Sequence, residues 1–420
     1  MESGSEGVRA AAVPDVVAPP PLHPRFPIAD GARGFAVISV TVVHVWLFTG
    51  GFGGFTESLP NRAMVRMDGV VSIFFLLSAF LLYRPMIAHR GGGPGAPTVG
   101  DYARRRFLRI YPAYWVALTG LALFPGLVGV FSDEWWRFYS LGFFLDPGAT
   151  TACIGDPGFR CGLPQSWTLT VEMTFYLMLP LYAWLTSRLA RGRSVRSWMR
   201  AELLLIAALS ILSLLLGGEP FGLRHDSWYR FSFLSHFFWL GLGLAAAVIS
   251  VGYGNRREAL PRPLRLAAEN PAACWALAFA IWVGTVFAYY PAPFPVAPFS
   301  SFEYASLNLV QGVMSALLLI PVVFGNPNLG VASRFFGHPL MLWFGLVSYG
   351  LYLWSVTITV DLGVGGADAG FWPVLAMTFL ITLPFAAASY YLIERPLMRL
   401  KYRSLREVLR RPGRAARAQR

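Results

Sequence analysis

The stretch FWPVLAMTFLITLPFAAASYYL, residues 371–392, contains no charged side chain. Crossing a bilayer core takes about 20 helical residues, so a run of this length is expected to be a transmembrane helix. Similar runs recur along most of the 420-residue chain, in which 55% of residues are hydrophobic and 14% are charged. Soluble domains carry about 25% charged residues. The composition therefore predicts an all-α fold, a polytopic membrane helical bundle, and argues against a set of soluble domains.

Apolar runs bounded by charge or by Pro and Gly predict about ten transmembrane helices. The first 29 residues are rich in Pro and Ala, so we expect residues 1–29 to be a disordered cytoplasmic tail. A membrane domain over residues 30–395 and a basic cytoplasmic tail over residues 396–420 are expected to follow. The expected spans are residues 31–51, 67–86, 110–131, 166–187, 202–217, 231–252, 272–290, 303–325, 339–361 and 371–392.

The distribution of cations predicts the orientation of the chain, because short cytoplasmic loops retain Lys and Arg. With the N-terminus inside, 29 of the 35 Lys and Arg residues fall on the cytoplasmic side. Both termini are therefore expected to be cytoplasmic, in a multi-pass protein of the cell membrane. The net charge of +13 is then mainly a topology signal, and nucleic acid is not an expected partner.

The three cysteines do not form a metal-ligand pattern. Cys153 and Cys161 fall in one predicted outward loop, where either a disulfide or two reduced thiols would fit their spacing. Cys274 lies within a predicted span and is expected to be a small core residue. The sequence therefore predicts no metal site.

Two titratable residues stand out inside the predicted spans, where each such side chain costs several kcal/mol to bury. His44 follows Arg33 by eleven residues, which is about 16 Å along a helix and places His44 near the middle of the membrane. Glu172 is expected about 9 Å below the outer surface and His44 about 14 Å below it, so the two could meet within about one helical turn. A carboxylate that orients a histidine suits proton abstraction from an alcohol. The alternative is a buried histidine bonded to a hydroxyl such as that of Thr41.

A row of arginines lies on the predicted cytoplasmic side, within the sequence RRRFLRIYPAYW, residues 104–115. On a helix Arg106 and Arg109 share one face, and Arg105 joins Arg109 one turn apart. Such guanidinium groups can bind phosphates through paired hydrogen bonds. The alternative is a positive-inside signal that contacts lipid headgroups.

Taken together, these motifs resemble the integral-membrane acyltransferases of the acyltransferase 3 type over about residues 26–400. Six segments carry the resemblance in the family's order: DGARG (30–34) running on to His44, FFLLSAFLL (74–82), RRFLRIYPAYW (105–115), SWTLTVEMTFY (166–176), SYGLYL (348–353) and ERP (394–396).

The resemblance implies an O-acyltransferase that moves an acyl group from cytoplasmic acyl-CoA, expected to be acetyl-CoA, to a hydroxyl of a carbohydrate or glycosylated acceptor at the outer face. It assigns His44 and Glu172 to the acyl transfer. Arg33, Arg106 and Arg109 are assigned to the acyl-donor end. The expected partners are acyl-CoA, the acceptor and the lipid bilayer, with no permanently bound cofactor. The competing hypothesis is a proton-coupled secondary transporter, in which His44 and Glu172 relay protons and the arginines bind an anionic solute.

Overall fold

The computed structural model describes residues 27–51, 58–142, 162–218, 223, 229, 232–254, 257–288, 300–325, 330–365 and 370–400. These residues form helices and connecting turns, with no strand among them, which confirms the predicted all-α class. The two predicted tails, except for residues 27–29 and 396–400, and the segment with Cys153 and Cys161 lie outside the described residues. Cys274 is buried in the helix 271–288 and is a free cysteine, as expected for a core residue.

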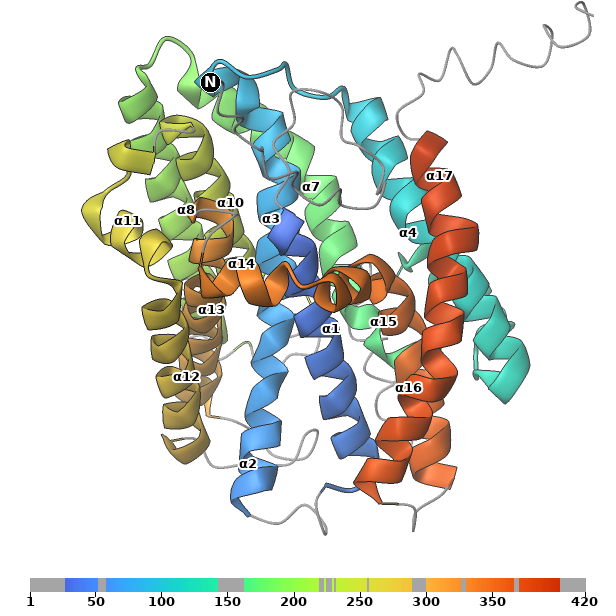
Figure 1. The fold of residues 1–420 in the computed structure, drawn as a ribbon. Coiled ribbons are helices and arrows are strands. Elements are labelled where there is room, and N and C mark those ends of the chain that lie inside the picture. The colour runs from blue at the N-terminus through green and yellow to red at the C-terminus, as the bar shows by residue number, and fades with distance from the viewer. Residues whose placement is uncertain are drawn as a thin grey trace, which may run out of the picture. The chain divides into compact units, whose positions relative to one another are not determined.

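The longer helices follow one another in the order shown in Figure 1. They are α1 (Pro27–Phe48), α3 (Val71–Ile87), α4 (Val99–Leu121), α7 (Trp167–Ala190), α8 (Val195–Gly217), α10 (Phe237–Tyr253), α12 (Pro271–Ala288), α13 (Ser301–Phe324), α15 (Pro339–Gly365) and α16 (Phe371–Ala388). Short helices connect or extend them: α2 (Leu59–Val65), η1 (Arg66–Val70), η2 (Ala88–Gly91), η3 (Ala122–Gly126), α5 (Trp135–Ser140), η5 (Pro164–Ser166), η7 (Arg257–Ala259), α11 (Arg262–Glu269), α14 (Val331–Phe336), η8 (Ser389–Glu394) and α17 (Arg395–Leu400).

Among the described residues, eight helices are long and apolar enough to cross a membrane. The helix α10 is apolar but has 17 residues, and α7 is not among the eight. The predicted count of ten spans is therefore not confirmed, although every predicted span overlaps one of the long helices.

Several helices begin where the sequence offers a side chain that caps the first turn. The Thr98 hydroxyl accepts a hydrogen bond from the backbone N–H of Asp101 at the start of α4, and Ser194 does the same for Ser197 at the start of α8. Ser300 and Glu303 form a reciprocal capping box at the start of α13. The Thr98 cap thus fixes where α4, the helix that carries Arg106 and Arg109, begins.

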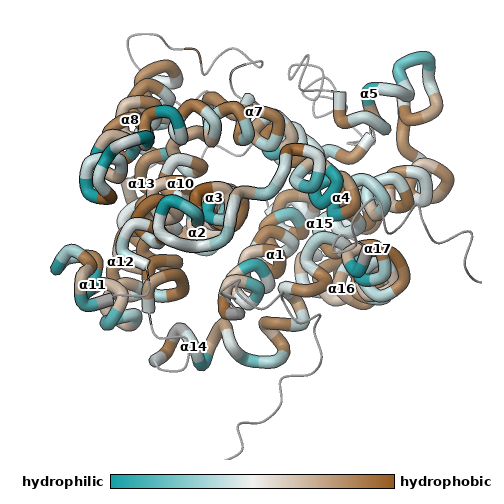
Figure 2. Tube along the Cα trace, turned by 90° about the horizontal axis from the view of Figure 1, so that it is seen from above, coloured by the Kyte–Doolittle hydropathy of each residue, from teal (hydrophilic) through white to brown (hydrophobic). Residues whose placement is uncertain are grey.

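The helices α1 and α15 pack closely along their whole length, and with α3 they occupy the middle of the bundle (Figure 2). Glycines allow this approach: a Cβ on Gly345 would lie 1.9 Å from the carbonyl oxygen of Asp30, and a Cβ on Gly363 would lie 2.7 Å from that of Phe48. Because early residues of α1 contact early residues of α15, and late residues contact late ones, the two helices run parallel. Each α1 residue lies beside the α15 residue about 315 positions later.

A buried polar network joins α3 and η2 to α7 and α8, and we call it the Arg90 network (Tyr83, Arg90, Thr186, Glu202). The Arg90 Nη1 atom lies 2.7 Å from Glu202 Oε2, and Arg90 Nη2 donates to Thr186 Oγ1 at 2.9 Å. The Tyr83 hydroxyl donates to Glu202 and also bonds to Thr186 at 2.8 Å. Both charged side chains are about 95% buried, so the pair is almost fully removed from solvent. This network fastens α7, the helix that carries Glu172, to its two neighbours.

Candidate active site

The helix α4 places Arg106 and Arg109 on one face, as the sequence predicts. Arg106 extends over the ring of Tyr176 from α7, with its guanidinium carbon 5.9 Å from the ring centre. It makes no hydrogen bond or ion pair with any described residue, and its Nε atom is buried. The donors of this arginine are therefore free to bind an anion.

Arg109 and Arg33 are each held by one weak ionic contact. Arg109 Nη1 lies 3.8 Å from Glu394 Oε2 and 3.1 Å from the sulfur of Met398. Arg33 Nη1, on α1, lies 3.3 Å from Asp30 Oδ1 on the same helix. Both arginines lie within electrostatic range of Arg106. We call Arg33, Arg106 and Arg109 the arginine cluster, and its members come from two helices, α1 and α4.

Glu172 lies beside the arginine cluster. Its Oε2 atom accepts a hydrogen bond from the Tyr176 hydroxyl at 2.6 Å, and that hydroxyl lies 3.1 Å from Ser78 Oγ on α3. Arg33 and Arg106 are both within electrostatic range of the Glu172 carboxylate. The structure thus joins α1, α3, α4 and α7 around one carboxylate.

His44 lies farther along α1, about 16 Å beyond Arg33. Its Nδ1 atom is buried and has no hydrogen-bond partner among the described residues, and its ring stacks on Phe48 at 6.3 Å. The hydroxyl of Thr41 bonds instead to the backbone carbonyl of Val37 at 2.9 Å. The alternative hypothesis, in which the Thr41 hydroxyl bonds to the His44 ring, is therefore not what the structure shows.

The structure does not bring His44 and Glu172 into contact. The reason is the position of η5, where Gln165 Nε2 donates to the backbone carbonyl of Leu353 on α15 at 3.0 Å. By the offset between the two parallel helices, residue 353 lies level with Ile38 of α1. The helix α7 therefore starts below the predicted outer surface, near the level of Ile38. Glu172 lies further along α7 toward the predicted cytoplasmic side, so it reaches the level of Arg33 and not that of His44.

Several residues of this site were not assigned a role from the sequence. Tyr176 lies one turn after Glu172 on the same helix face, and this spacing could have indicated its hydrogen bond. Tyr102, Ser78 and Glu394 come from three other segments, and only the packing of α4, α3 and η8 brings them here. Sequence spacing carries no signal for such contacts.

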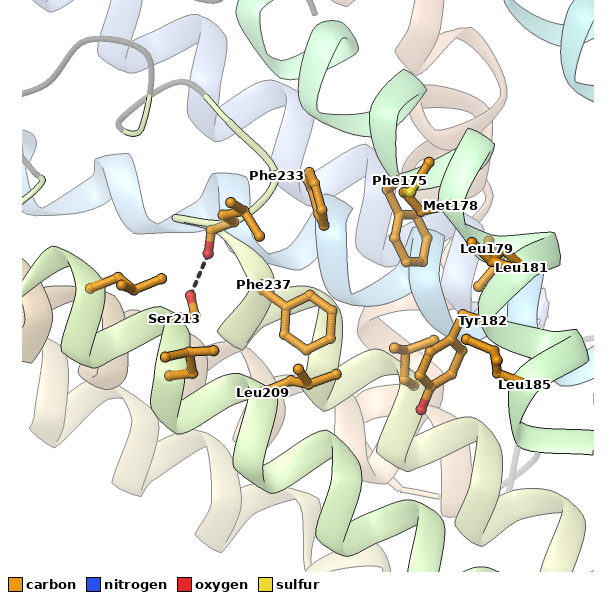
Figure 3. A pocket seen from close by; sticks show the side chains of 14 residues that line it. Phe175, Met178, Leu179, Leu181, Tyr182, Leu185, Leu209, Ser213, Phe233 and Phe237 are labelled. Carbon is orange, nitrogen blue, oxygen red and sulfur yellow. Dashed lines mark hydrogen bonds between the residues drawn. The ribbon is translucent and has the colours of Figure 1, made fainter. Parts of the chain in front are cut away.

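An apolar cavity of about 260 Å³ lies between α7, α8, α10 and the residues just before α10 (Figure 3). Phe175 and Leu181 line it from α7 and Leu209 from α8. Its one hydroxyl besides Tyr182, on Ser213, donates to the backbone carbonyl of Leu234 at 2.5 Å. The Tyr182 hydroxyl has no hydrogen-bond partner among the described residues, and no charged side chain lines the cavity.

Comparison with known proteins finds several relatives of the chain. YrhL of Bacillus subtilis, whose name places it among peptidoglycan O-acetyltransferases, is 26% identical over 403 residues, covering 91% of this chain and 56% of YrhL. Peptidoglycan O-acetyltransferase OatA of Listeria monocytogenes is 22% identical over 395 residues, covering 88% of this chain and 55% of OatA. The chain thus spans about half the length of these two relatives. Nodulation protein 10 of Rhizobium leguminosarum is 27% identical over 390 residues, covering 89% of this chain and 93% of that protein.

No solved structure matches the chain. The family model described as "Acyltransferase domain", of the acyltransferase 3 type, matches residues 27–393. This range includes Arg33, His44, Arg106, Arg109 and Glu172. The chain therefore belongs to this acyltransferase family, and its helices are those of a multi-pass membrane protein.

Proposed function

We propose that this protein transfers an acyl group, in the first instance acetyl, from cytoplasmic acyl-CoA to a hydroxyl of a carbohydrate or glycosylated acceptor at the outer face of the cell membrane. Two relatives bear the name peptidoglycan O-acetyltransferase, which makes a peptidoglycan glycan the first acceptor to test. The transporter alternative has no support from the family or from the names of these relatives.

The observation that carries the proposal is the free guanidinium of Arg106. A charged side chain within a membrane bundle is costly unless it is paired, and Arg106 has neither an ion-pair partner nor a hydrogen-bond partner among the described residues. Arg33 and Arg109 add charge close to it. Phosphate is the anion that such a group of guanidinium donors binds best, and the phosphates of acyl-CoA meet that need.

The distance from the arginine cluster to His44 suits a donor with a long arm. About 16 Å of α1 separates Arg33 from His44. The extended pantetheine arm of CoA is of this order of length, so phosphates held at the arginine cluster would allow the thioester to reach His44. Because Glu172 lies near Arg33 and not near His44, we give it a different role from the one that the sequence suggested. It orients Tyr176 and balances part of the charge of Arg33 and Arg106.

In the proposed reaction, a ring nitrogen of His44 takes the proton of the acceptor hydroxyl. The resulting alkoxide oxygen attacks the thioester carbonyl carbon, a new C–O ester bond forms, and the C–S bond breaks. The thiolate of CoA leaves and takes up the proton that the imidazolium holds. Charge is conserved at each step, and no other co-reactant is needed.

Release of the CoA thiol tests the proposal directly. Protein purified in detergent is given acetyl-CoA with or without a tetrasaccharide of alternating N-acetylglucosamine and N-acetylmuramic acid. We expect thiol release that depends on the tetrasaccharide, together with an acetyl ester on the sugar. The His44→Ala variant should lose transfer by a factor on the order of 10²–10⁴ while remaining folded. Full activity in that variant would rule out the role of His44, and solute uptake into vesicles without thiol release would favour a transporter.

A further inference from the structure

The side chain of Gln165 lies in η5, the turn that leads into α7, and 4% of the residue is exposed. Its Nε2 atom donates to the backbone carbonyl oxygens of Tyr352 and Leu353 on α15, at 3.2 and 3.0 Å. A carbonyl oxygen can only accept a hydrogen bond, so these two contacts determine which side of the amide carries the NH₂ group. The amide oxygen, Oε1, is therefore turned away from these carbonyls.

The Oε1 atom of Gln165 is a buried acceptor that has no hydrogen-bond partner among the described residues. Such an acceptor is costly, and in native proteins it is usually satisfied by water or by a ligand. The hydroxyls nearby are already engaged. Those of Thr168 and Tyr352 bond to each other at 2.9 Å, and that of Tyr352 donates to the backbone carbonyl of Gln165 at 2.6 Å. The donor that Oε1 needs must come from elsewhere.

A row of polar side chains connects Gln165 with the arginine cluster. Thr168, Glu172 and Tyr176 follow one another at intervals of four residues, so they share one face of α7. Tyr352 of α15 bonds to Thr168 and lies within electrostatic range of Glu172. The row therefore runs from Tyr176 and Glu172, beside the arginine cluster, to Gln165 at its predicted outer end.

The level of Gln165 falls between the arginine cluster and His44. Gln165 bonds to the carbonyl of Leu353, which lies level with Ile38 of α1 by the offset between α1 and α15. Ile38 is five residues after Arg33 and six before His44, which is about 8 Å and about 9 Å along the helix. A donor with its phosphates at the arginine cluster and its thioester at His44 must therefore pass the level of Gln165 near the middle of its arm.

The arm of acyl-CoA carries the hydrogen-bond donor that Gln165 lacks. It contains two amide groups, and each amide has one neutral N–H, which is a suitable donor to a neutral amide oxygen. The amide that joins pantoate to β-alanine lies near the middle of the arm, and the other amide lies nearer the sulfur. The first of these two amides is thus the one expected at the level of Gln165.

We propose that Gln165 Oε1 accepts a hydrogen bond from the pantoate–β-alanine amide N–H of the acyl donor. This inference rests on the proposed function and names a donor contact that neither the motifs nor the names of the relatives assign. Because the Nε2 atom of Gln165 is held by α15, the bond fixes how far the thioester extends toward His44. Gln165 is then a binding residue for the donor arm and takes no part in proton transfer.

The competing explanation is that Gln165 only fastens η5 to α15. Two CoA analogues separate these roles without any change in the protein. In the first analogue, CH₂ replaces the N–H of the pantoate–β-alanine amide, and in the second the same replacement is made in the amide nearer the sulfur. Both keep the phosphates, the thiol and the length of the arm.

Two variants complete the design. Gln165→Met has no amide oxygen and cannot make the proposed bond. Gln311→Met is the matched control, since Gln311 lies outside the arginine cluster and donates through Nε2 to Asp68 at 2.9 Å.

The measurement is the Kd of CoA and of each analogue, from titrations of purified protein in detergent. We expect the wild type to bind the first analogue about five- to tenfold more weakly than CoA, because one neutral hydrogen bond is lost. The second analogue should bind as tightly as CoA. Gln165→Met should bind CoA and the first analogue equally, whereas Gln311→Met should discriminate between them as the wild type does.

Equal affinity of the wild type for CoA and the first analogue would overturn the inference, even if Gln165→Met yields too little folded protein to titrate. So would a Gln165→Met variant that still binds the first analogue more weakly than CoA. A wild-type protein that binds no CoA and releases no thiol from acetyl-CoA would contradict the proposed function itself, and the inference would fall with it.

Discussion

Two groups of charged residues lie within the helix bundle, and their bonding differs. In the Arg90 network the guanidinium of Arg90 bonds to Glu202, Thr186 and the carbonyl of Ala183, and it lies 5.7 Å from the centre of the Trp198 ring. In the arginine cluster, Arg106 has a ring contact and no hydrogen bond to the described residues.

This difference separates a structural ion pair from a ligand site. Both Nη groups of Arg90 bond within the protein, so they hold helices together, and only the buried Nε of Arg90 lacks a partner among the described residues. A charge with free donors remains available for a bound anion. The position of an arginine in the sequence does not reveal this distinction, because both groups lie near the predicted cytoplasmic side.

Removing the side chain of Arg90 should have the largest effect. Arg90→Ala leaves Glu202 buried without its partner, which typically costs about 3–5 kcal/mol of folding free energy. The measurement is the thermal unfolding midpoint in detergent, and we expect a large fall that abolishes activity through loss of folded protein. An unchanged midpoint would show that the Arg90 network does not stabilise the bundle. The matched control is Arg265→Ala, because Arg265 bonds to a backbone carbonyl at an exposed position.

Removing the side chain of Arg106 should weaken donor binding without lowering the stability of the fold. Arg106→Ala loses bonds to the proposed phosphates, each worth about 1.5–3 kcal/mol for a charged group. We expect the KM for acetyl-CoA to rise by about 10- to 100-fold, with an unchanged unfolding midpoint. Arg106→Lys should recover only part of the affinity, because lysine cannot form paired hydrogen bonds. A fall in the midpoint comparable with that of Arg90→Ala would remove the distinction between the two groups.

Neutralising Glu394 tests whether Arg109 takes part in donor binding. Glu394→Gln removes the carboxylate that lies 3.8 Å from Arg109, and this leaves more positive charge for the donor. We expect the KM for acetyl-CoA to fall about threefold, an electrostatic change of well under 1 kcal/mol. The effect should shrink as salt is added. A higher KM would instead show that Glu394 is needed to position Arg109.

Removing the hydroxyl of Ser78 should have the smallest effect. Ser78→Ala deletes one neutral hydrogen bond to Tyr176, which costs about 1 kcal/mol. Since Glu172 keeps its own bond to Tyr176, we expect at most about a fivefold loss of kcat/KM. A loss as large as that of Arg106→Ala would indicate that Ser78 contacts a substrate.

The membrane helices could be predicted from the sequence because each one needs only its own apolar run. The shared face of Arg106 and Arg109 could be predicted for the same reason, since it depends on helix geometry alone. The start of α10 shows where local patterns stop being sufficient. The sequence predicts a span from residue 231, but the helix starts at Phe237, after a turn in which Ser232 bonds to His236.

The depth of Glu172 could not be predicted from its own helix. It depends on Gln165, whose side chain is bonded to backbone carbonyls of α15, a helix almost 190 residues away in the sequence. The parallel packing of α15 against α1 then sets the level of Glu172 relative to Arg33 and His44. Such tertiary contacts leave no periodic pattern in the sequence. The prediction that His44 and Glu172 meet therefore used only their expected depths in the membrane.

The proposed function depends on binding of the acyl-donor phosphates by the arginine cluster. Its most direct test is to titrate purified wild-type protein in detergent with CoA and, separately, with pantetheine, which has the same arm and thiol but no phosphate. We expect CoA to bind at least about tenfold more tightly than pantetheine, and added salt to weaken CoA binding. Equal affinity for the two compounds would contradict this role of the arginine cluster.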